Sequence, residues 1–307
     1  MTEKFYYKKL FKFLNLIINF IIIKYCYFKF IKIKIKKKKI KICLCVIGKK
    51  ENRYIKEFVN HYKKLGYNKI FIYDNNQIND EKFEDIIQDE VDKGFVSIIN
   101  YRGLKGKQFS SYRDCYKKNN KKFDWLSFFD FDEFLELRAS YKKIQDFLGE
   151  RRFKKCQNIK INWIYYNNKN GLYYENKPLE KRIPKRTKLG RCIKSTVRGN
   201  LSVNYWSKMG NPHTSFNKFI SCSSSGKIIN YSSPFNIPPD VKYAYLKHYY
   251  IKSFEEQCIK IQRGYADRHN ENITLRIKNF FNLNKKNKNK LKIMKKIFNI
   301  SSIDKIK

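Results

Sequence analysis

Apolar and polar positions alternate in regular blocks through the first half of the chain. A continuously apolar run at residues 40–47 predicts a buried strand. Apolar residues with helical spacing follow from Asn52 to Leu65, and Gly66 ends that helix. Further strands are predicted at 69–73, 95–99 and 123–129, and further helices at 83–91 and 106–119. This alternation predicts an α/β fold whose parallel strands carry helices on both faces.

The second half has a less regular pattern. Strands are predicted at 159–166, 192–198 and 244–250, and a polar, basic loop or lid at 167–190. Ser253 and Glu256 have the spacing of a capping box, which predicts a helix reaching residue 261. After residue 278 the chain is rich in Lys and Asn, which predicts a frayed segment or an isolated basic helix. We therefore divide the chain into an N-terminal segment (1–38), one domain (39–278) and a basic tail (279–307).

Polar loops follow three of the predicted strands, at residues 48–52, 74–77 and 130–133. In open α/β sheets, ligands bind beyond the carboxyl ends of the strands. The convergence of these three loops would form a cleft large enough for a nucleotide.

The third loop carries the clearest chemical signal. Asp130, Asp132 and Glu133 directly follow an apolar run, and buried charges are costly unless something pairs with them. On an extended chain Asp130 and Asp132 point to the same side, where they suit Mg²⁺ or Mn²⁺ together with diphosphate oxygens. Glu133 would face the other way if the strand continued. An Asp-x-Asp pair alone is a weak signal, because many such pairs are turn acids or salt-bridge partners.

The charge of the chain is large but unevenly distributed. The formal net charge is +41 over 307 residues, and 42% of the residues are hydrophobic, enough for a substantial core. Almost half of the excess lies in the two ends. No zinc finger, RNP pattern or P-loop is present, so the charge predicts attraction to anionic lipid or to a negatively charged donor, and no specific nucleic acid. The eight cysteines include no Cys-x-x-Cys pair, so they predict no structural zinc site, although they permit disulfides.

The N-terminal segment raises the question of a membrane. Residues 10–23 are strongly apolar but shorter than the roughly 20 residues that a spanning helix needs. The segment fits a short signal anchor, an interfacial amphipathic helix or a hydrophobic extension. The Lys-rich run that follows it would place the main domain in the cytoplasm by the positive-inside rule. We expect a membrane-associated protein whose topology is open.

Four motifs together resemble glycosyltransferases of the GT-A fold, of the family 92 type and its family 2-like relatives. They are Val46 to Phe58 with His61-Tyr62 and Leu65-Gly66, Phe71 to Asn75, Gln108 to Tyr112 with Cys115 to Trp125 and Asp130 to Phe134, and His248 to Glu256 with Lys260 and Arg263-Gly264. The resemblance covers residues 40–265. It implies a Rossmann-like mixed sheet flanked by helices, with Asp-x-Asp at a strand end.

The resemblance also implies roles for individual residues. It places Asp130 and Asp132 on a divalent metal and on the diphosphate, with His248 completing the metal shell and His213 as a rival for that role. The residues expected to bind the nucleoside or line the donor side are Glu51, Asp74, Gln108 and Arg113.

The implied reaction moves a sugar from a nucleoside diphosphate sugar to a glycan, lipid or protein hydroxyl. Mn²⁺ or Mg²⁺ would neutralise the departing diphosphate, and Asp132 and Glu133 are the catalytic candidates. An inverting enzyme needs a carboxylate that takes the acceptor proton, and Glu133 is the candidate for that step. Two alternatives remain: a metal-dependent nuclease or phosphotransferase acting on nucleic acid, and a non-catalytic protein that binds a membrane surface.

Overall fold

The computed structural model describes residues 40–138, 141–168, 170–201, 219–230, 233–264 and 272–299. The elements of the first half are β1 (Ile42–Gly48), α2 (Asn52–Leu65), β2 (Lys69–Asp74), α3 (Glu84–Asp92), β3 (Val96–Asn100), α4 (Gln108–Asn119) and β4 (Trp125–Phe128). All seven were predicted from the hydrophobic pattern, with bounds that differ by at most two residues.

The second half contains more strands than its pattern predicts. Its elements are β5 (Glu133–Leu137), α5 (Ile144–Leu148), η1 (Arg151–Phe153), β6 (Asn158–Asn167), α6 (Leu179–Arg182), β7 (Arg186–Arg198), β8 (Ser221–Cys222), β9 (Ile228–Ile229), β10 (Ala244–Ile251) and α7 (Phe254–Arg263). The prediction of a loop or lid through residue 190 is wrong at its end. There β7 already pairs with β6, and its first four residues are exposed, so this part of the strand does not need an apolar sequence.

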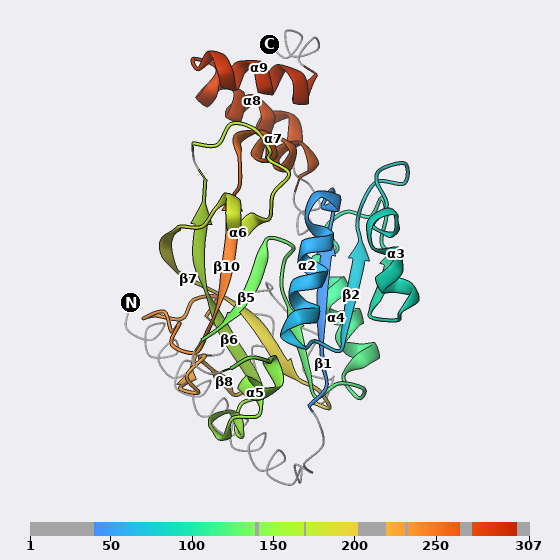
Figure 1. The fold of residues 1–307 in the computed structure, drawn as a ribbon, viewed down its shortest axis with the longest axis vertical. Helices are drawn as coiled ribbons and strands as arrows, with labels where there is room; N and C mark the ends of the chain where they lie inside the picture. The colour runs from blue at the N-terminus through green and yellow to red at the C-terminus, as the bar shows by residue number, and fades with distance from the viewer. Residues whose placement is uncertain are drawn as a thin grey trace, which may run out of the picture.

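One mixed sheet carries the fold (Figure 1), in the order β3-β2-β1-β4-β7-β6-β10-β5. The strands β3, β2, β1 and β4 are parallel to one another. Beyond β4 the sheet continues with the antiparallel partner β7, and β5 closes the far edge against β10. This arrangement confirms the mixed α/β sheet flanked by helices that the sequence predicts.

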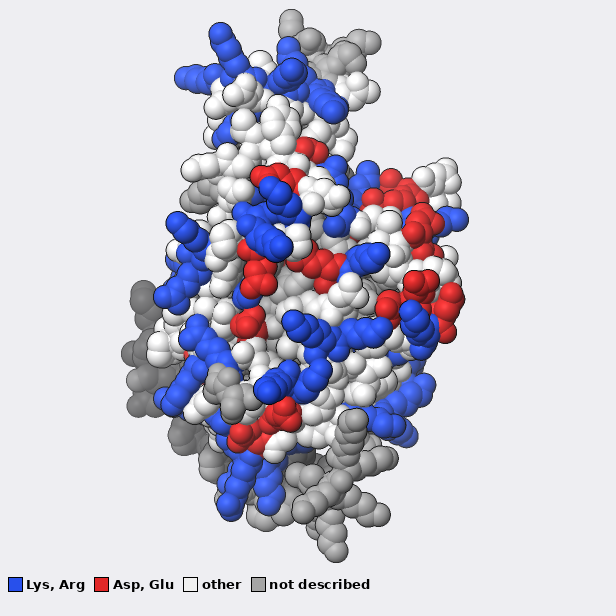
Figure 2. All heavy atoms as spheres, in the orientation of Figure 1, with Lys and Arg blue, Asp and Glu red and all other residues white. Residues whose placement is uncertain are grey.

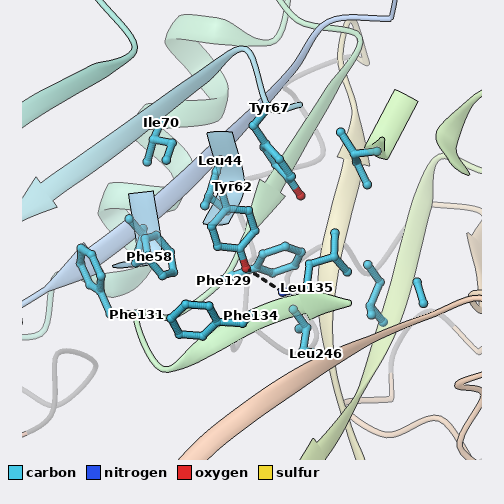
Figure 3. Close-up of a cluster of buried hydrophobic side chains, with 14 of the residues drawn as sticks. Leu44, Phe58, Tyr62, Tyr67, Ile70, Phe129, Phe131, Phe134, Leu135 and Leu246 are labelled. Atoms are coloured by element: carbon cyan, nitrogen blue, oxygen red, sulfur yellow. Dashed lines mark hydrogen bonds between the residues drawn. The ribbon is translucent and has the colours of Figure 1, made fainter. Parts of the chain in front are cut away.

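Helix α2 packs its apolar stripe onto the sheet and links its two halves. Phe58 and Tyr62 on this stripe are fully buried, and their rings contact the aromatic residues that follow β4 (Figure 3). The hydroxyl of Tyr62 donates to the carbonyl of Glu133 (2.7 Å) and accepts from the amide of Leu135 (3.2 Å). These contacts fix the start of β5, and with it the loop that carries the acids.

The C-terminal stretch forms two helices rather than a frayed segment or an isolated helix. Helices α8 (Ile273–Asn284) and α9 (Lys288–Phe298) pack against α7 at one end of the molecule (Figure 1). The apolar residues buried between them are Phe254, Cys258, Ile261, Ile293, Met294 and Phe298. This apolar contact explains why a Lys-rich sequence is ordered here.

Two further expectations concern cysteines and the membrane. A disulfide joins Cys156 to Cys222 and ties the start of β6 to β8. Within the ranges given above, no helix is both long and apolar enough to span a bilayer. The N-terminal segment at residues 1–38 and His213 lie outside the described residues.

Candidate active site

The loops after β1, β2 and β4 meet at one edge of the sheet, as the sequence predicts. The amide of Asn75 donates to the carbonyl of Gly48 (2.9 Å), and the amide of Lys50 donates to Oδ1 of Asn76 (2.7 Å). The ring of Phe131 lies directly against Gly48, where an added Cβ would be 2.3 Å from two ring carbons. The three loops therefore pack against one another and leave no space for a larger side chain at Gly48.

Asp130 and Asp132 lie in a turn between two strands, and Glu133 starts the second strand, so the expectation of one continued extended segment is wrong. Strand β4 ends at Phe128, and Glu133 begins β5. Asp130 Oδ1 accepts from Gln108 Nε2 (3.0 Å) and from Tyr112 Oη (3.1 Å). Its Oδ2 accepts from the buried ammonium of Lys194 on β7 (2.7 Å). The structure thus joins Asp130 and Gln108, two residues that the resemblance assigns to the donor side.

Asp132 and His248 come together from opposite ends of the sequence. Asp132 Oδ1 lies 3.5 Å from His248 Nε2, and its Oδ2 accepts from Lys260 Nζ on α7 (2.8 Å). Burial alone would raise the pKa of Asp132, but Lys260 and His248 outweigh it and hold that pKa well below its usual value. Burial lowers the pKa of His248 against the opposing pull of Asp132, so the imidazole is neutral and able to bind a metal.

Glu133 is completely buried. Its Oε2 accepts from the amide of Asp130 (3.0 Å), and its Oε1 has no hydrogen-bond partner and lies 3.8 Å from Lys194 Nζ. Burial raises the pKa of Glu133 well above its usual value, although Lys194 opposes the shift. Glu133 therefore stabilises the acidic turn through the amide of Asp130 and has no contact with solvent.

The other predicted residues have different surroundings. Glu51 is buried, and its Oε1 lies 2.5 Å from Arg263 Nη1. The carboxylate of Asp74 is engaged within the scaffold, by Arg102 (2.5 Å) and by Asn76. Arg113 is exposed on α4, and none of the described contacts joins it to the acidic turn.

A cavity of about 280 Å³ lies between the loop after β1 and helix α7. The side chains that line it include Glu51, Lys252, Lys260 and Arg263. The three cations were part of a motif in the sequence but received no role there. The sequence did contain a signal that two of them lie together, because Lys260 and Arg263 are three residues apart and so share one face of α7. Lys194 gave no such signal, since a lysine in a predicted strand usually faces solvent.

The predicted metal ligands fit a divalent cation in part. Asp132 and His248 present one oxygen and one neutral nitrogen at a spacing that two ligands of a single ion can adopt. Asp130 has a protein hydrogen-bond donor on each carboxylate oxygen. In the part of the chain that the structure describes, no group of three or more His, Cys, Asp or Glu side chains could hold a metal. A cation here would thus depend on two protein ligands plus oxygens from the substrate.

Comparison with known proteins gives one extensive match. A family model described as "Glycosyltransferase family 92" matches residues 38–299. No curated protein sequence matches the chain. This match confirms the resemblance to family 92 and the enzyme class that the sequence predicts.

Among solved structures, the chain is similar to TarS from S. aureus. TarS 1-349 in complex with UDP-GlcNAc is 11% identical, with a TM-score of 0.38, over 85% of this chain and 72% of that chain. A longer TarS structure is 12% identical, with a TM-score of 0.37, over 79% of this chain and 43% of that chain. The chain therefore spans less than half of the longer TarS structure.

Proposed function

The chain belongs to glycosyltransferase family 92, and from this premise we propose that it moves a sugar from a nucleoside diphosphate sugar to an acceptor hydroxyl. The observation that carries the proposal is the convergence of Asp132, His248 and Lys260 beside a cavity rimmed by further cations. A departing diphosphate needs positive charge and fixed donors around it, and this edge of the sheet offers both.

We propose that Asp132 and His248 hold a divalent cation, Mn²⁺ or Mg²⁺, together with oxygens of the donor. Such an ion would act as a Lewis acid on the leaving diphosphate. Asp130 acts differently in this proposal. It is oriented by Gln108, Tyr112 and Lys194, and it holds the acidic turn in place next to the ion.

Lys194, which is buried, and Lys260, which is partly buried, keep the acidic turn folded in this proposal while no donor is bound. Lys260 neutralises Asp132, and Lys194 lies between Asp130 and Glu133. A cation held by Asp132 and His248 would replace Lys260 as the counter-charge of Asp132, and Lys260 Nζ would then be able to donate to a phosphate oxygen. The chain thereby supplies charge stabilisation of its own beside the metal.

Calorimetric titration of UDP and GDP, with Mn²⁺ and with a chelator, tests this proposal. We expect binding of one nucleotide to be at least tenfold tighter with Mn²⁺, since a metal contact to phosphate is a strong charged interaction. Asp132→Asn should abolish the metal dependence, and Lys56→Met, at an exposed residue on α2 that does not line the cavity, serves as a control with unchanged affinity. Two results would contradict the proposal. One is a folded protein that binds neither nucleotide, and the other is an Asp132→Asn variant that binds the nucleotide with Mn²⁺ as tightly as the wild type does. A nuclease would instead bind random DNA with a steep salt dependence.

We further propose that the protein associates with a membrane. The support is the apolar N-terminal segment in the sequence and the surface of α8 and α9, whose residues 272–299 contain nine Lys or Arg and no acid. Figure 2 shows these basic side chains gathered over the C-terminal helices. Leu275 and Leu283 on α8 are 52% and 84% exposed and eight residues apart, so they share one face among the cations. Sedimentation with vesicles of neutral or anionic lipid tests the proposal, and equal absence from both pellets would refute it.

The disulfide between Cys156 and Cys222 indicates on which side of the membrane the domain lies. Disulfides persist in oxidising compartments and are rare in the cytosol. We therefore propose that the domain faces an oxidising compartment, the opposite of what the Lys-rich run after residue 23 predicts. Protease digestion of intact cells or microsomes distinguishes the two, since a protected domain in intact microsomes is expected and a digested one would refute the assignment.

A further inference from the structure

The side chain of Lys252 is largely buried at the wall of the cavity, and no described residue of opposite charge pairs with its ammonium. The residue follows β10 and is 7% exposed. No hydrogen bond or ion pair joins it to another described residue, and its nearest notable contact is the ring of Tyr54, 4.0 Å from Nζ. Burial lowers the pKa of Lys252, and the neighbouring Glu51 and Asp132 only partly oppose it. Partial loss of hydration without a counter-ion is unfavourable for an ammonium, so this position costs stability in the ligand-free protein.

The neighbouring charges are already matched to one another. Arg263 pairs with Glu51, and Lys260 pairs with Asp132. Lys252 is therefore the surplus cation of this group. Glu51, which also lines the cavity, has an unused acceptor, because its buried Oε2 has no hydrogen-bond partner. A ligand that satisfies both atoms must carry an anionic group and a hydroxyl or N–H donor.

We propose that Lys252 and Arg263 form the subsite for the donor's diphosphate, with Glu51 Oε2 accepting a hydrogen bond from a hydroxyl of the same ligand. This assignment rests on the proposed function and adds residues that the metal site does not contain. The cavity volume of about 280 Å³ is near the lower end of the range for ligand sites, which suits a diphosphate and its attached ring. Arg263 is held in place by Glu51 and by the carbonyl of Lys50 (3.3 Å), so its guanidinium is oriented before the ligand arrives.

The sign of a stability change separates this role from a purely structural one. If Lys252 only packs on Tyr54, Lys252→Met removes a cation–π contact and lowers the melting temperature. If Lys252 is kept for an anion, the same variant removes an unpaired buried charge and raises the melting temperature of the ligand-free protein by a few degrees. Residues at functional sites often lower the stability of the ligand-free protein because they are kept for binding.

The experiment is a titration of inorganic pyrophosphate into the full-length protein in the presence of a chelator, which removes any metal contribution. We expect Lys252→Met to weaken binding by at least about tenfold, the usual effect of losing a charged hydrogen bond. Lys252→Arg should remain within about threefold of the wild type, because it preserves the charge. The matched control is Lys56→Met, an exposed lysine on α2 that does not line the cavity, and it should change neither binding nor melting temperature.

Two results would overturn the subsite. One is pyrophosphate binding by Lys252→Met within about twofold of the wild type, because a lost charged contact costs far more. The other is weaker binding together with a lower melting temperature that Lys252→Arg does not restore. The subsite and the proposed function can also fail separately. A protein that binds pyrophosphate through Lys252 but transfers sugar from no nucleoside diphosphate sugar refutes the function alone. Sugar transfer with an unchanged KM in Lys252→Met refutes the subsite alone.

Discussion

Substitution of Gly48 by alanine should disturb the acidic turn through Phe131. The φ angle of Gly48 lies outside the left-handed region, so alanine meets no backbone penalty there. Its Cβ would instead lie 2.3 Å from Cδ2 and Cε2 of Phe131, whereas unstrained carbon atoms are about 3.5–4.0 Å apart. The ring must therefore retreat by more than about 1 Å.

The surroundings of Phe131 leave no easy direction for that movement. The ring is 2% exposed and packs against Phe58 and Phe83, with centroid distances of 4.8 and 5.6 Å. Overpacking of this kind costs about 1–3 kcal/mol of unfolding free energy. Because Phe131 stands between Asp130 and Asp132, its displacement also moves both acids, and a misplacement of about 1 Å can reduce catalysis about 100-fold.

Urea denaturation and titration of UDP with Mn²⁺ measure the two effects in the same preparations. Gly48→Ala should lower both stability and affinity, and the double variant Gly48→Ala/Phe131→Leu should recover part of each, because the smaller side chain makes room for the new methyl group. Unchanged stability and nucleotide binding in Gly48→Ala would refute the argument, and so would losses in the double variant that equal the sum of the two single variants.

Three further predictions concern the scaffold of the site. Burial lowers the pKa of His61, which contacts the carbonyl of Leu135 (2.9 Å), from 6.5 to about 4. Between these pH values the unfolded chain binds more protons than the folded one. The contribution of His61 to the free energy of unfolding is therefore complete above pH 6.5 and falls by up to about 3 kcal/mol as the pH drops to 4. Urea titrations across this pH range should show the loss in the wild type and not in His61→Gln. Lys194→Met removes the cation beside the buried Glu133 and the partly buried Asp130. It should cost about 3–5 kcal/mol of unfolding free energy by the same assay, and a near-neutral effect would show that the ion pairs are not essential. Gly199→Ala puts a Cβ 1.9 Å from the carbonyl of Phe123, so we expect a sharply lower melting temperature, and an unchanged one would contradict the close approach.

The first half of the fold was predictable because its signals are local. Each parallel strand is buried on both faces and reads as a short apolar run, while each helix shows its own period and a stop such as Gly66. The second half hides its strands. Strand β5 starts with a charged, buried Glu133, and β7 begins with several exposed residues, so neither has the apolar signature of a strand. Tertiary packing decides both elements.

The candidate site shows the same division. The positions of Asp130 and Gln108 followed from motifs in the first half, and the structure joins them at 3.0 Å. The direction of Glu133 depended on whether the strand continued past Asp130, and the sequence contains no signal for the turn that changes it. The roles of Lys194 and Lys252 could not be predicted, because nothing in a single sequence shows that a lysine on a strand or after one is buried.

The pairing of charges explains why the two halves of the sheet must form together. Glu51 and the acids of the turn come from the first 133 residues, and the cations beside them come from β7 or α7. The sequence separations are 64 for Asp130 and Lys194 and 128 for Asp132 and Lys260. Without the second half, the acidic turn would hold three carboxylates next to a buried strand with no counter-charge, which is strongly unfavourable. A fragment that ends after β5 should therefore lack an ordered acidic turn even if its parallel strands pair. The donor site we propose therefore depends on the whole domain. Among the described cations that line the cavity, Lys252 is the one without an ion pair, and in our proposal the ligand supplies its partner.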